Sequence, residues 1–381
     1  MDNKQMLMIP GPTPVPEKVL LAMAKHPIGH RSGDFSKVIG ELTENLKWLH
    51  QTQNDVVMLT ASGTGAMEAG IINFLSPGDR VLVGNNGKFG DRWAKVSKAY
   101  GLTVEEIKAE WGQPLDPETF RARLTADTEK SIKAVIITHS ETSTGVLNDL
   151  EAINKAVKEH GEALIIVDAV TSLGAISVPI DEWGLDVVGS GSQKGYMIPP
   201  GLAFVAISAK AWKAYESAKL PRFYFDLKKY KKATDDNSSP FTPPVNLMYG
   251  LQASLEMMKA EGLDHIFARH ARQTLATRTA MKALGLKLYA PDDAASPAIT
   301  AVCTDDAEKI RSAMRKQFDI ALAGGQDHLK GKIFRIGHLG FVCDRDILSC
   351  VGALESVLQG LGLSPATPGA GVAAAAKVFA G

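Results

Sequence analysis

The sequence predicts an α/β fold, in which a large domain surrounds a mainly parallel sheet and a smaller α+β domain follows. Short, almost continuous apolar runs recur through the first half of the chain, which is typical of strands buried on both faces of a parallel sheet. Helical patterns separate several of these runs, as they do in open α/β sheets. With 381 residues the chain is too long for one small core, so we expect two domains.

Six apolar runs predict the strands of the large domain. They are Val56–Leu59, Arg80–Val83, Ala134–Thr138, Ala163–Val167, Asp186–Gly189 and Ala203–Ile207. Helices are predicted between some of them, at Ala66–Phe74, Arg92–Tyr100 and Leu150–His160. This alternation indicates strands that run in parallel and are joined by helices.

The C-terminal part predicts a mixture of helices and short strands. The helices are Val245–Glu261, Leu263–Leu284, Asp306–Gln317 and Asp344–Gly360. The strands are Pro297–Cys303 and Ile333–Gly337. Such a mixture is typical of a small α+β domain.

We divide the chain into an N-terminal arm (1–16), a large domain (17–259), a small domain (260–363) and an Ala/Gly-rich tail (364–381). Four prolines between positions 10 and 16 favour an extended arm that drapes over another surface. We expect the tail to be a frayed helix or a disordered end. Residues 211–245, rich in Lys, Asp, Ser, Pro and aromatics, predict a surface or interface excursion.

Composition and charge argue against several classes of protein. The 42 basic and 42 acidic residues cancel, so nothing indicates a nucleic-acid or membrane-surface partner. Cys303, Cys343 and Cys350 form no C-x-x-C pair and are expected to be reduced, and the nine histidines show no metal-binding spacing. We find neither a signal peptide nor a membrane-spanning run, and expect a cytoplasmic protein.

Two residues at predicted strand ends point to cofactor chemistry. Asp168 ends the run ALIIVD, and Lys194 follows DVVGSGSQ, so both belong to the edge where open α/β sheets bind ligands. Each alone has an ordinary explanation, a structural aspartate or a surface lysine. Together they match a pyridoxal-phosphate site, which needs an amine for a Schiff base and an acid beside the pyridine nitrogen.

A glycine-rich turn, Ser62–Gly65, directly precedes a predicted helix. The free N–H groups and the dipole of a helix start favour a phosphate. The turn is neither a dinucleotide fingerprint nor a P-loop, which argues against a nicotinamide dehydrogenase and against an ATP site. Phe89, in NGKFG, either stacks on a flat cofactor ring or faces the core, and the residues favour neither reading.

Two further segments offer polar groups. THSETSTG (138–145) brings hydroxyls and a carboxylate to a strand end. A triad of Ser140, His139 and Asp168 is rejected, because no G-x-S-x-G elbow exposes a nucleophilic serine. Arg335, in the short apolar strand of IFRIGHLG, is a candidate for binding a carboxylate through its planar fork.

In their order along the chain, PGPTPVP, SGTGAMEA, GKFGDRW, THSETSTGVL, VDAVTSLGA, SGSQKGYMIPPG and FRIGHLG resemble segments of class V pyridoxal-phosphate aminotransferases. The resemblance spans about residues 6–362 and is greatest to the alanine–glyoxylate and serine–glyoxylate group. It implies the fold type I architecture, pyridoxal 5'-phosphate as cofactor, and a homodimer with active sites at the subunit interface. The implied substrates are an amino acid and a 2-oxo acid, with alanine or serine giving its amino group to glyoxylate.

The resemblance also implies a role for each matching residue. Lys194 resembles the catalytic Schiff-base lysine, and Asp168 resembles the partner of the pyridine nitrogen. The phosphate-binding positions are matched by Ser62, Gly63, Thr64 and Gln193, and by Thr242 from the other subunit.

The remaining matches concern the ring and the substrate. Phe89 takes the place of the ring-stacking aromatic, often Trp in relatives, and Thr142 matches a hydroxyl near the ring's 3-oxygen. Arg335 resembles the substrate-carboxylate arginine, and Gly11 resembles the arm glycine that lines the substrate pocket. Ser239 departs from some relatives, which carry an aromatic there, and this departure bears on one phosphate hydrogen bond.

Other functions stay open at this point. The same scaffold supports phosphonate aminotransferases, decarboxylases, lyases and desulfurases, although Cys343 and Cys350 lack the mobile loop that a desulfurase needs. Some bacterial relatives have carried the label of a soluble hydrogenase subunit, which adds a non-catalytic accessory role. Hydrogenase metal sites need cysteine thiolates in patterns that this sequence lacks.

Overall fold

The structure is a computed structural model that describes residues 5–363 and 366–381. Within these residues a seven-stranded sheet forms the large domain, in the order β2–β10–β9–β8–β5–β3–β4. The strands are β2 (Asp55–Leu59), β3 (Arg80–Asn85), β4 (Thr103–Lys108), β5 (Ile132–Thr138), β8 (Leu164–Asp168), β9 (Val187–Gly191) and β10 (Ala203–Ile207). β10 is antiparallel to both of its neighbours, and the pairs from β9 to β4 are parallel.

The six apolar runs of the sequence are all strands of this sheet, so the predicted α/β class is confirmed. The sequence did not indicate β4, whose residues TVEEIK are mostly polar. β4 lies at the edge of the sheet, so one side of its backbone pairs with no other strand and most of its side chains are not fully buried. Polar residues are therefore tolerated there.

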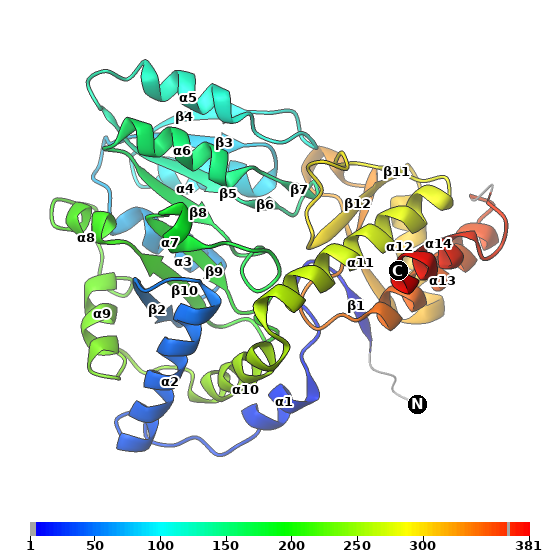
Figure 1. Ribbon diagram of the computed structural model, residues 1–381, viewed down its shortest axis with the longest axis horizontal. Helices are drawn as coiled ribbons and strands as arrows, with labels where there is room; N and C mark the ends of the chain where they lie inside the picture. The colour runs from blue at the N-terminus through cyan, green and yellow to red at the C-terminus, as the bar shows by residue number, and fades with distance from the viewer. Residues whose placement is uncertain (1–4, 364–365) are drawn as a thin grey trace.

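Helices cover both faces of the large sheet (Figure 1). One face packs on α2 (Gly33–Leu49), α5 (Pro117–Thr125), α6 (Leu150–His160), α7 (Ile180–Trp183) and α10 (Val245–Glu261). The other packs on α3 (Gly63–Ile72), α4 (Lys88–Ala99), α8 (Ala209–Tyr215) and α9 (Leu227–Asp235). The alternation along a strand divides the core: Val56 and Met58 belong to one face, Val57 and Leu59 to the other.

A second sheet, in the order β1–β13–β14–β12–β11, forms the smaller part of the molecule. Its strands are β1 (Met6–Met8), β11 (Lys287–Leu288), β12 (Ile299–Cys303), β13 (Ile320–Gly324) and β14 (Ile333–Gly337). Its apolar face packs on α11 (Leu263–Ala283), α12 (Ala307–Phe318), α13 (Asp344–Gly360) and α14 (Ala370–Ala380). The remaining elements are α1 (Glu17–Met23), the short pair β6 (Ser140–Glu141) and β7 (Val146–Leu147), and the 3-10 turn η1 (Asp327–Leu329).

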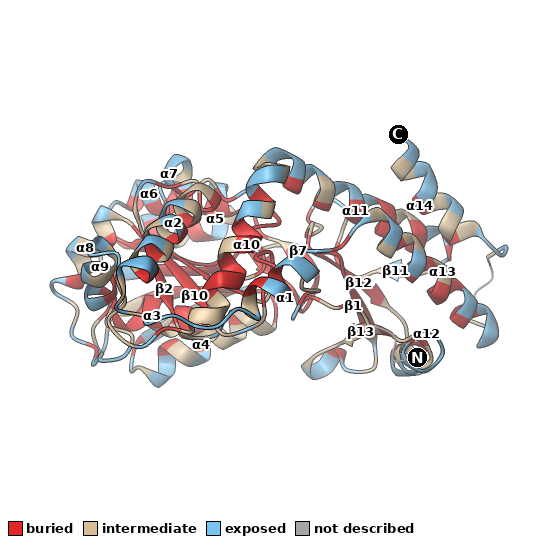
Figure 2. Cartoon of the chain, turned by 90° about the horizontal axis from the view of Figure 1, so that it is seen from below, coloured by how far each residue is buried: buried red, intermediate tan, exposed pale blue. Residues whose placement is uncertain are grey.

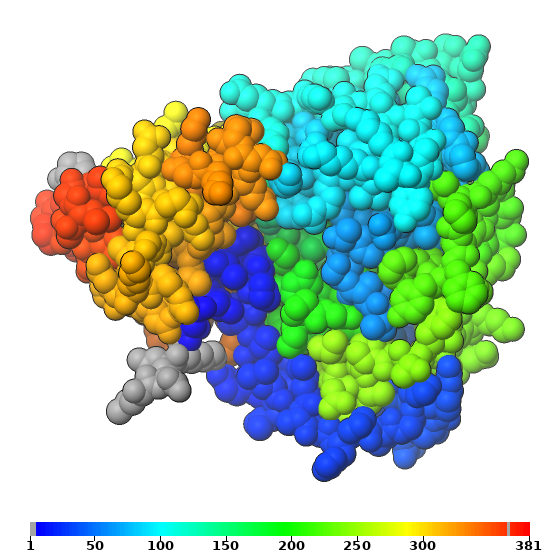
Figure 3. All heavy atoms as spheres, turned by 180° about the vertical axis from the view of Figure 1, so that it is seen from behind, coloured from blue at the N-terminus to red at the C-terminus, as the bar shows by residue number. Residues whose placement is uncertain are grey.

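The N-terminal arm is more than an extended drape. Within it, β1 pairs in parallel with β13, so residues from the start of the chain complete the small sheet. The chain then passes between the two parts of the molecule, where its dark blue atoms are visible in Figure 3. Residues 1–4 lie outside the described residues.

The Ala/Gly-rich C-terminal segment also differs from the expectation of a frayed or disordered end. Residues 370–380 form α14, which packs against α11 and α13 and buries Ala375 completely. Small side chains allow this close packing: a Cβ on Gly371 would lie 2.9 Å from Leu284. Figure 2 shows the outer side of α14 exposed and its inner side against the neighbouring helices. Residues 364–365 of the predicted tail are not among those described.

The polar excursion, residues 211–245, contains α9 and ends at the start of α10. It exposes the ring of Phe223, of which 74% is accessible, beside Phe241 at 6.2 Å between ring centroids. In residues 5–363 and 366–381, no helix combines the length and the apolar character that crossing a membrane requires.

Candidate active site

A cavity of about 300 Å³ opens at the carboxyl-end edge of the large sheet, where the parallel strands end. The residues that line it and that the sequence had singled out are Gly11, Ser62, Gly63, Thr64, Phe89, Ser140, Asp168, Gln193 and Lys194. The others are Pro12, Met67, Arg92, Val170, Thr171 and Pro200. Residues far apart in the sequence thus meet at the edge where the topology predicts a ligand.

Asp168 is the last residue of β8, and its carboxylate is buried. Its Oδ1 accepts a hydrogen bond of 2.9 Å from the backbone N–H of Val170. Burial raises the pKa of Asp168 to about 6, against the opposing effects of that hydrogen bond and of the charges on Arg92 and Lys194. A cation placed next to Asp168 would therefore gain a strong partner.

Lys194 lies three residues beyond β9, and its amine points into the same cavity. The Nζ donates a hydrogen bond to the carbonyl oxygen of Pro10 in the arm. Burial lowers the pKa of Lys194 to about 8, with a further decrease from the positive charge of Arg335, while Asp168 acts in the opposite direction. The amine is therefore much closer to its neutral, nucleophilic form than an exposed lysine is.

Hydrogen bonds from Thr13 hold the arm against the backbone at this lysine. Thr13 donates its hydroxyl to the carbonyl oxygen of Lys194 at 3.0 Å and its N–H to that of Gln193 at 3.1 Å. Gly11 has φ +145°, and a Cβ there would lie 2.8 Å from both Cε and Nζ of Lys194. Only glycine allows the arm to come this close to the amine.

A cradle for a phosphate lies at the start of α3. Ser62 is the N-cap residue, and its side chain makes no capping hydrogen bond, so the hydroxyl is available to a ligand. Gln193 lines the same cavity, and the N–H groups of its side-chain amide are donors of the kind that phosphate oxygens accept. A ten-residue helix presents free N–H groups at this end. These features fit the phosphate of pyridoxal phosphate.

Phe89 faces the cavity rather than either core cluster. Its position depends on Glu141, whose fully buried carboxylate accepts hydrogen bonds from the N–H groups of Phe89 (2.9 Å) and Gly90 (3.1 Å) at the start of α4. A Cβ on Gly87 would overlap the side chain of Glu141. The sequence left open whether Phe89 stacks on a flat ligand or packs into the core. In the structure its ring lines the cavity and is available to a flat ligand.

Glu141 also faces the small domain, where Arg335 lies on β14. Arg335 donates to the carbonyl oxygens of Thr142 (2.7 Å, from Nη1) and Gly324 (2.9 Å, from Nε). Burial lowers the pKa of Arg335 to about 10, and the charge of Glu141 opposes this effect. Burial likewise raises the pKa of Glu141, against its hydrogen bonds with Ser143, Gly90 and Phe89.

Three of the predicted residues do not line the cavity. Thr142 is buried and contributes its carbonyl oxygen to Arg335. Arg335 lies outside the lining as well, but its charge lowers the pKa of Lys194. Thr242 is exposed on the surface of the same chain, beside Phe241. Ser239, the departure from the family pattern, accepts a hydrogen bond at its carbonyl oxygen from Arg31.

The rejected serine triad is also absent from the geometry. Ser140 Oγ lies 2.7 Å from Ser296 Oγ, and His139 contacts Asp168 only through a backbone hydrogen bond of 3.0 Å. Within the described ranges, no group of three or more His, Cys, Asp or Glu side chains is placed to hold a metal ion.

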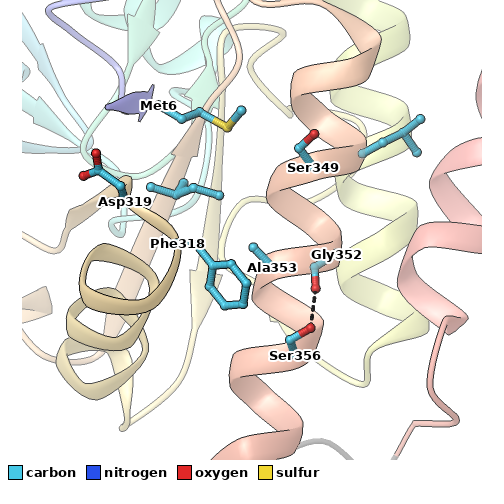
Figure 4. A pocket seen from close by; sticks show the side chains of 9 residues that line it. Met6, Phe318, Asp319, Ser349, Gly352, Ala353 and Ser356 are labelled. Carbon is cyan, nitrogen blue, oxygen red and sulfur yellow. Dashed lines mark hydrogen bonds between the residues drawn. The ribbon is translucent and has the colours of Figure 1, made fainter. Parts of the chain in front are cut away.

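A larger groove, of about 620 Å³, lies on the small domain between β1, β13 and α13 (Figure 4). Its walls are mostly apolar or carry hydroxyls, and Ser356 Oγ donates to the carbonyl oxygen of Gly352. The carboxylate of Asp319 at its rim accepts a hydrogen bond from Gln5 at 3.1 Å. Size alone therefore does not identify the active site, because the chemical groups converge in the smaller cavity.

Arg92 is the most important residue at the site that sequence reasoning missed. It follows Phe89 by three positions on α4, so the two side chains share one face of the helix. This spacing is visible in GKFGDRW, where the sequence analysis considered only the aromatic residue.

Comparisons with known proteins agree with this geometry. The family model of the class-V aminotransferases matches residues 6–336. The chain is 71% identical to the soluble hydrogenase 42 kDa subunit of Anabaena cylindrica, over all of both chains. It is 41% identical to L-aspartate–glyoxylate aminotransferase of Paracoccus denitrificans, covering 100% of this chain and 97% of the relative.

Among solved structures, ureidoglycine–glyoxylate aminotransferase of Bacillus subtilis superposes with a TM-score of 0.94 and 30% identity, over 100% of this chain and 99% of the other. The resemblance seen in the sequence motifs thus extends to the whole fold. The chain belongs to the class V aminotransferases, a family whose cofactor is pyridoxal phosphate and whose substrates are an amino acid and an oxo acid.

Proposed function

We propose that this protein transfers the amino group of alanine or serine to glyoxylate, giving glycine and a 2-oxo acid. The observation that carries the proposal is one cavity that holds a lysine amine, a buried carboxylate and a phosphate cradle, with Arg335 near enough for its charge to lower the pKa of Lys194. The two named aminotransferases reported above differ in their donor but share glyoxylate in their names. Glyoxylate is therefore the better-supported half of the reaction.

Lys194 is the proposed base and acid of the reaction. Pyridoxal phosphate, when bound, supplies an aldehyde for amines and a pyridinium ring that accepts electrons. Lys194 removes the proton from the donor Cα as a base and, as an acid, delivers a proton to carbon C4' of the cofactor. Its lowered pKa, about 8, matches this task because both protonation states are accessible near neutral pH.

Asp168 keeps a proton on the pyridine nitrogen. Its carboxylate is buried and is held by the N–H of Val170, so it has a defined position at the end of β8. A cationic ring nitrogen would hold the pKa of this carboxyl down and offset the burial that raises it. The electron-accepting form of the cofactor thus depends on this one ion pair.

Arg335 is the proposed anchor for the carboxylate that both substrates share. Among the described residues it forms no ion pair, and its hydrogen bonds go to two carbonyl oxygens. Its guanidinium therefore has N–H groups left for a substrate carboxylate. The negative charge of that carboxylate would compensate the buried positive charge of Arg335. Because alanine, serine and glyoxylate all carry this group, one arginine serves both halves of the reaction.

We also propose a homodimer in which Thr242 reaches the phosphate of the partner subunit. Thr242 is exposed, and the rings of Tyr224 and Phe241 stack at 4.9 Å next to the exposed Phe223. Leu21 on α1 is also 73% exposed. An exposed apolar surface next to Thr242, which does not line the cavity of its own chain, supports a subunit interface at this place.

A non-catalytic role in a hydrogenase complex is the second candidate, favoured by the name of the relative at 71% identity. Other pyridoxal-phosphate chemistry on the same fold, such as that of lyases or desulfurases, is the third. Cys350 is buried, and burial raises the pKa of its thiol to about 12, which disfavours a reactive thiolate. The visible absorbance of a bound cofactor separates the first two candidates.

The deciding experiment is a screen of single amino acids. Purified protein with cofactor is mixed with one donor at a time, and loss of the visible band reports the first half of the reaction. Glyoxylate is then added, and recovery of the band together with glycine release reports the second half. The proposal expects both steps with alanine or serine, and neither step in Lys194→Ala. A protein without a chromophore, or a band that no amino acid bleaches, contradicts it.

A further inference from the structure

Arg92 is an arginine at the cofactor cavity that the reaction described so far does not use. It lies in the first half of α4 and lines the cavity together with Thr64 and Phe89. Its side chain is partly buried. Among the described residues it has no ion-pair partner: Asp91, next to it in the sequence, pairs instead with Lys95 at 2.7 Å.

Two contacts define where its guanidinium lies. The Cζ is 4.8 Å from the centroid of the Phe89 ring, in a cation–π arrangement. The Nη1 is 3.5 Å from the hydroxyl oxygen of Thr64, in the first turn of α3. The cation thus joins the aromatic ring to the cradle at the start of α3. Its charge also acts on the carboxyl of Asp168, where it opposes the burial that raises the pKa of that group.

An arginine in this position needs an anion. Its contact with Thr64 is long for a hydrogen bond and its contact with Phe89 uses one face only, so most of its donors stay available. The adjacent cradle combines free N–H groups, the uncapped Ser62 hydroxyl and the side-chain amide of Gln193, yet these groups carry no full positive charge. Arg92 and Lys194 are the cationic residues that line the cavity, and the amine of Lys194 is assigned to the aldehyde of the cofactor, so Arg92 is the cation left for a phosphate dianion.

We propose that Arg92 is a further binding residue of the cofactor site, whose guanidinium supplies the positive charge for the cofactor phosphate while it backs the ring of Phe89. This inference rests on the proposed cofactor site. The rival explanation is that Arg92 only supports the ring of Phe89 and never meets the phosphate. The two explanations differ in what they require of the ligand, because pyridoxal has the same ring and aldehyde as pyridoxal phosphate but no phosphate.

The test is to measure the binding of both ligands to the full-length chain. Cofactor is removed with hydroxylamine and dialysis, and tryptophan fluorescence is followed during titration with pyridoxal phosphate or with pyridoxal. For Arg92→Gln we expect the affinity for pyridoxal phosphate to fall about 10- to 100-fold, as for the loss of a charge-assisted hydrogen bond. The affinity for pyridoxal should change by less than about twofold, and Arg92→Lys should lie between wild type and Arg92→Gln.

Lys95→Gln is the matched control. Lys95 belongs to the same helix, has the same charge and is 68% exposed at its side chain, so its loss should leave both affinities unchanged. Equal losses for the two ligands in Arg92→Gln would reduce Arg92 to a support of Phe89 and overturn the proposal. Unchanged affinity for pyridoxal phosphate would overturn it as well.

A second measurement covers the case in which Arg92→Gln does not fold. Inorganic phosphate should raise the unfolding temperature of the wild-type apoprotein, and should raise that of Arg92→Lys less. Equal shifts in the two proteins would contradict a phosphate contact. If wild type itself bound neither pyridoxal phosphate nor phosphate, the cofactor site would be wrong, which is a different failure from that of Arg92.

Discussion

The two buried cations to which we assign roles in the proposed reaction come from different parts of the molecule. Lys194 follows a strand of the large parallel sheet, and Arg335 lies on β14 of the small antiparallel sheet. Both donate hydrogen bonds to backbone carbonyl oxygens, and burial lowers the pKa of both. The outcome differs because of chemistry: with a pKa of about 8 the lysine can lose its proton near neutral pH, whereas the arginine at about 10 stays charged.

Desolvation thus acts on both side chains, but in the proposed reaction it makes Lys194 a proton carrier and leaves Arg335 as the charged anchor of the substrate carboxylate. What decides is the side chain placed there. A lysine in the Arg335 position would be a poorer anchor, because it lacks the fork and its charge is more easily lost. An arginine in the Lys194 position would keep its proton near neutral pH and could not act as a base. The predictions below test each side of this comparison.

The largest effect is expected for Lys194→Ala. We predict that turnover falls by about 10³-fold or more, because both the base and the attachment point of the cofactor are removed. The visible band of the lysine-bound cofactor should disappear as well. Amino transfer is measured as glycine release, with Lys309→Ala, an exposed lysine on α12, as the control. Activity near wild type in Lys194→Ala would refute the assignment of this lysine.

Arg335→Gln tests the anchor. The affinity for amino acids and for glyoxylate should fall about 10- to 100-fold, because a charge-assisted hydrogen-bonded pair is lost. Arg335→Lys should recover part of it, since the charge is kept without the fork. The KM of each substrate and the cofactor absorbance are measured together. Arg315→Gln, on exposed α12, is the control, and unchanged KM values in Arg335→Gln would remove its proposed role.

The lowered pKa of Lys194 predicts how fast the apoprotein captures its cofactor at different pH values. Only the neutral amine attacks an aldehyde, and its share rises with pH until the pKa is passed. The capture rate should therefore increase about tenfold between pH 7 and pH 9 and level off above about pH 9. Above pH 7 Asp168, with a pKa of about 6, contributes little to the change. A rate that still rises steeply at pH 9 to 10 would indicate an ordinary exposed lysine.

Glu141→Gln tests the connection between the two parts. Both carboxylate oxygens of Glu141 accept hydrogen bonds from backbone N–H groups, and in the glutamine variant one of these oxygens is replaced by an NH2 group that can only donate. Because a donor then faces a donor, we expect a loss of about 1–3 kcal/mol in the free energy of unfolding. Weaker cofactor binding should accompany it, since Phe89 loses its support. Urea unfolding gives the free energy. Glu159→Gln, in an exposed ion pair, should change it by less than about 1 kcal/mol.

Thr242→Ala should have the smallest effect. If Thr242 reaches the phosphate of the partner subunit, the loss of one hydrogen bond lowers cofactor affinity by about fivefold. The exposed Thr125→Ala provides the comparison. Cofactor affinity and subunit mass in solution are measured side by side. A monomeric protein, or an affinity that does not change, would contradict the proposed interface contribution.

Sequence reasoning worked best where one physical pattern dominates. The six buried strands were recognisable because both of their faces are covered, so nearly every residue is apolar. Asp168 and Lys194 were recognisable because each follows such a strand. It failed for β4 and β13: β4 is mostly polar at an edge, and β13, IALAG, is short and looks like part of a loop.

The sequence by itself determined the α/β class, the six buried strands of the large sheet and the family of the protein. Only the tertiary structure decided that the arm completes the small sheet as β1, that residues 370–380 pack as α14, and that Arg92 joins Phe89 at the cavity. The reason is that strand and helix patterns are local properties of the chain. The pairing of Met6 with Ile320 and the desolvation of Lys194 arise only when distant segments pack together.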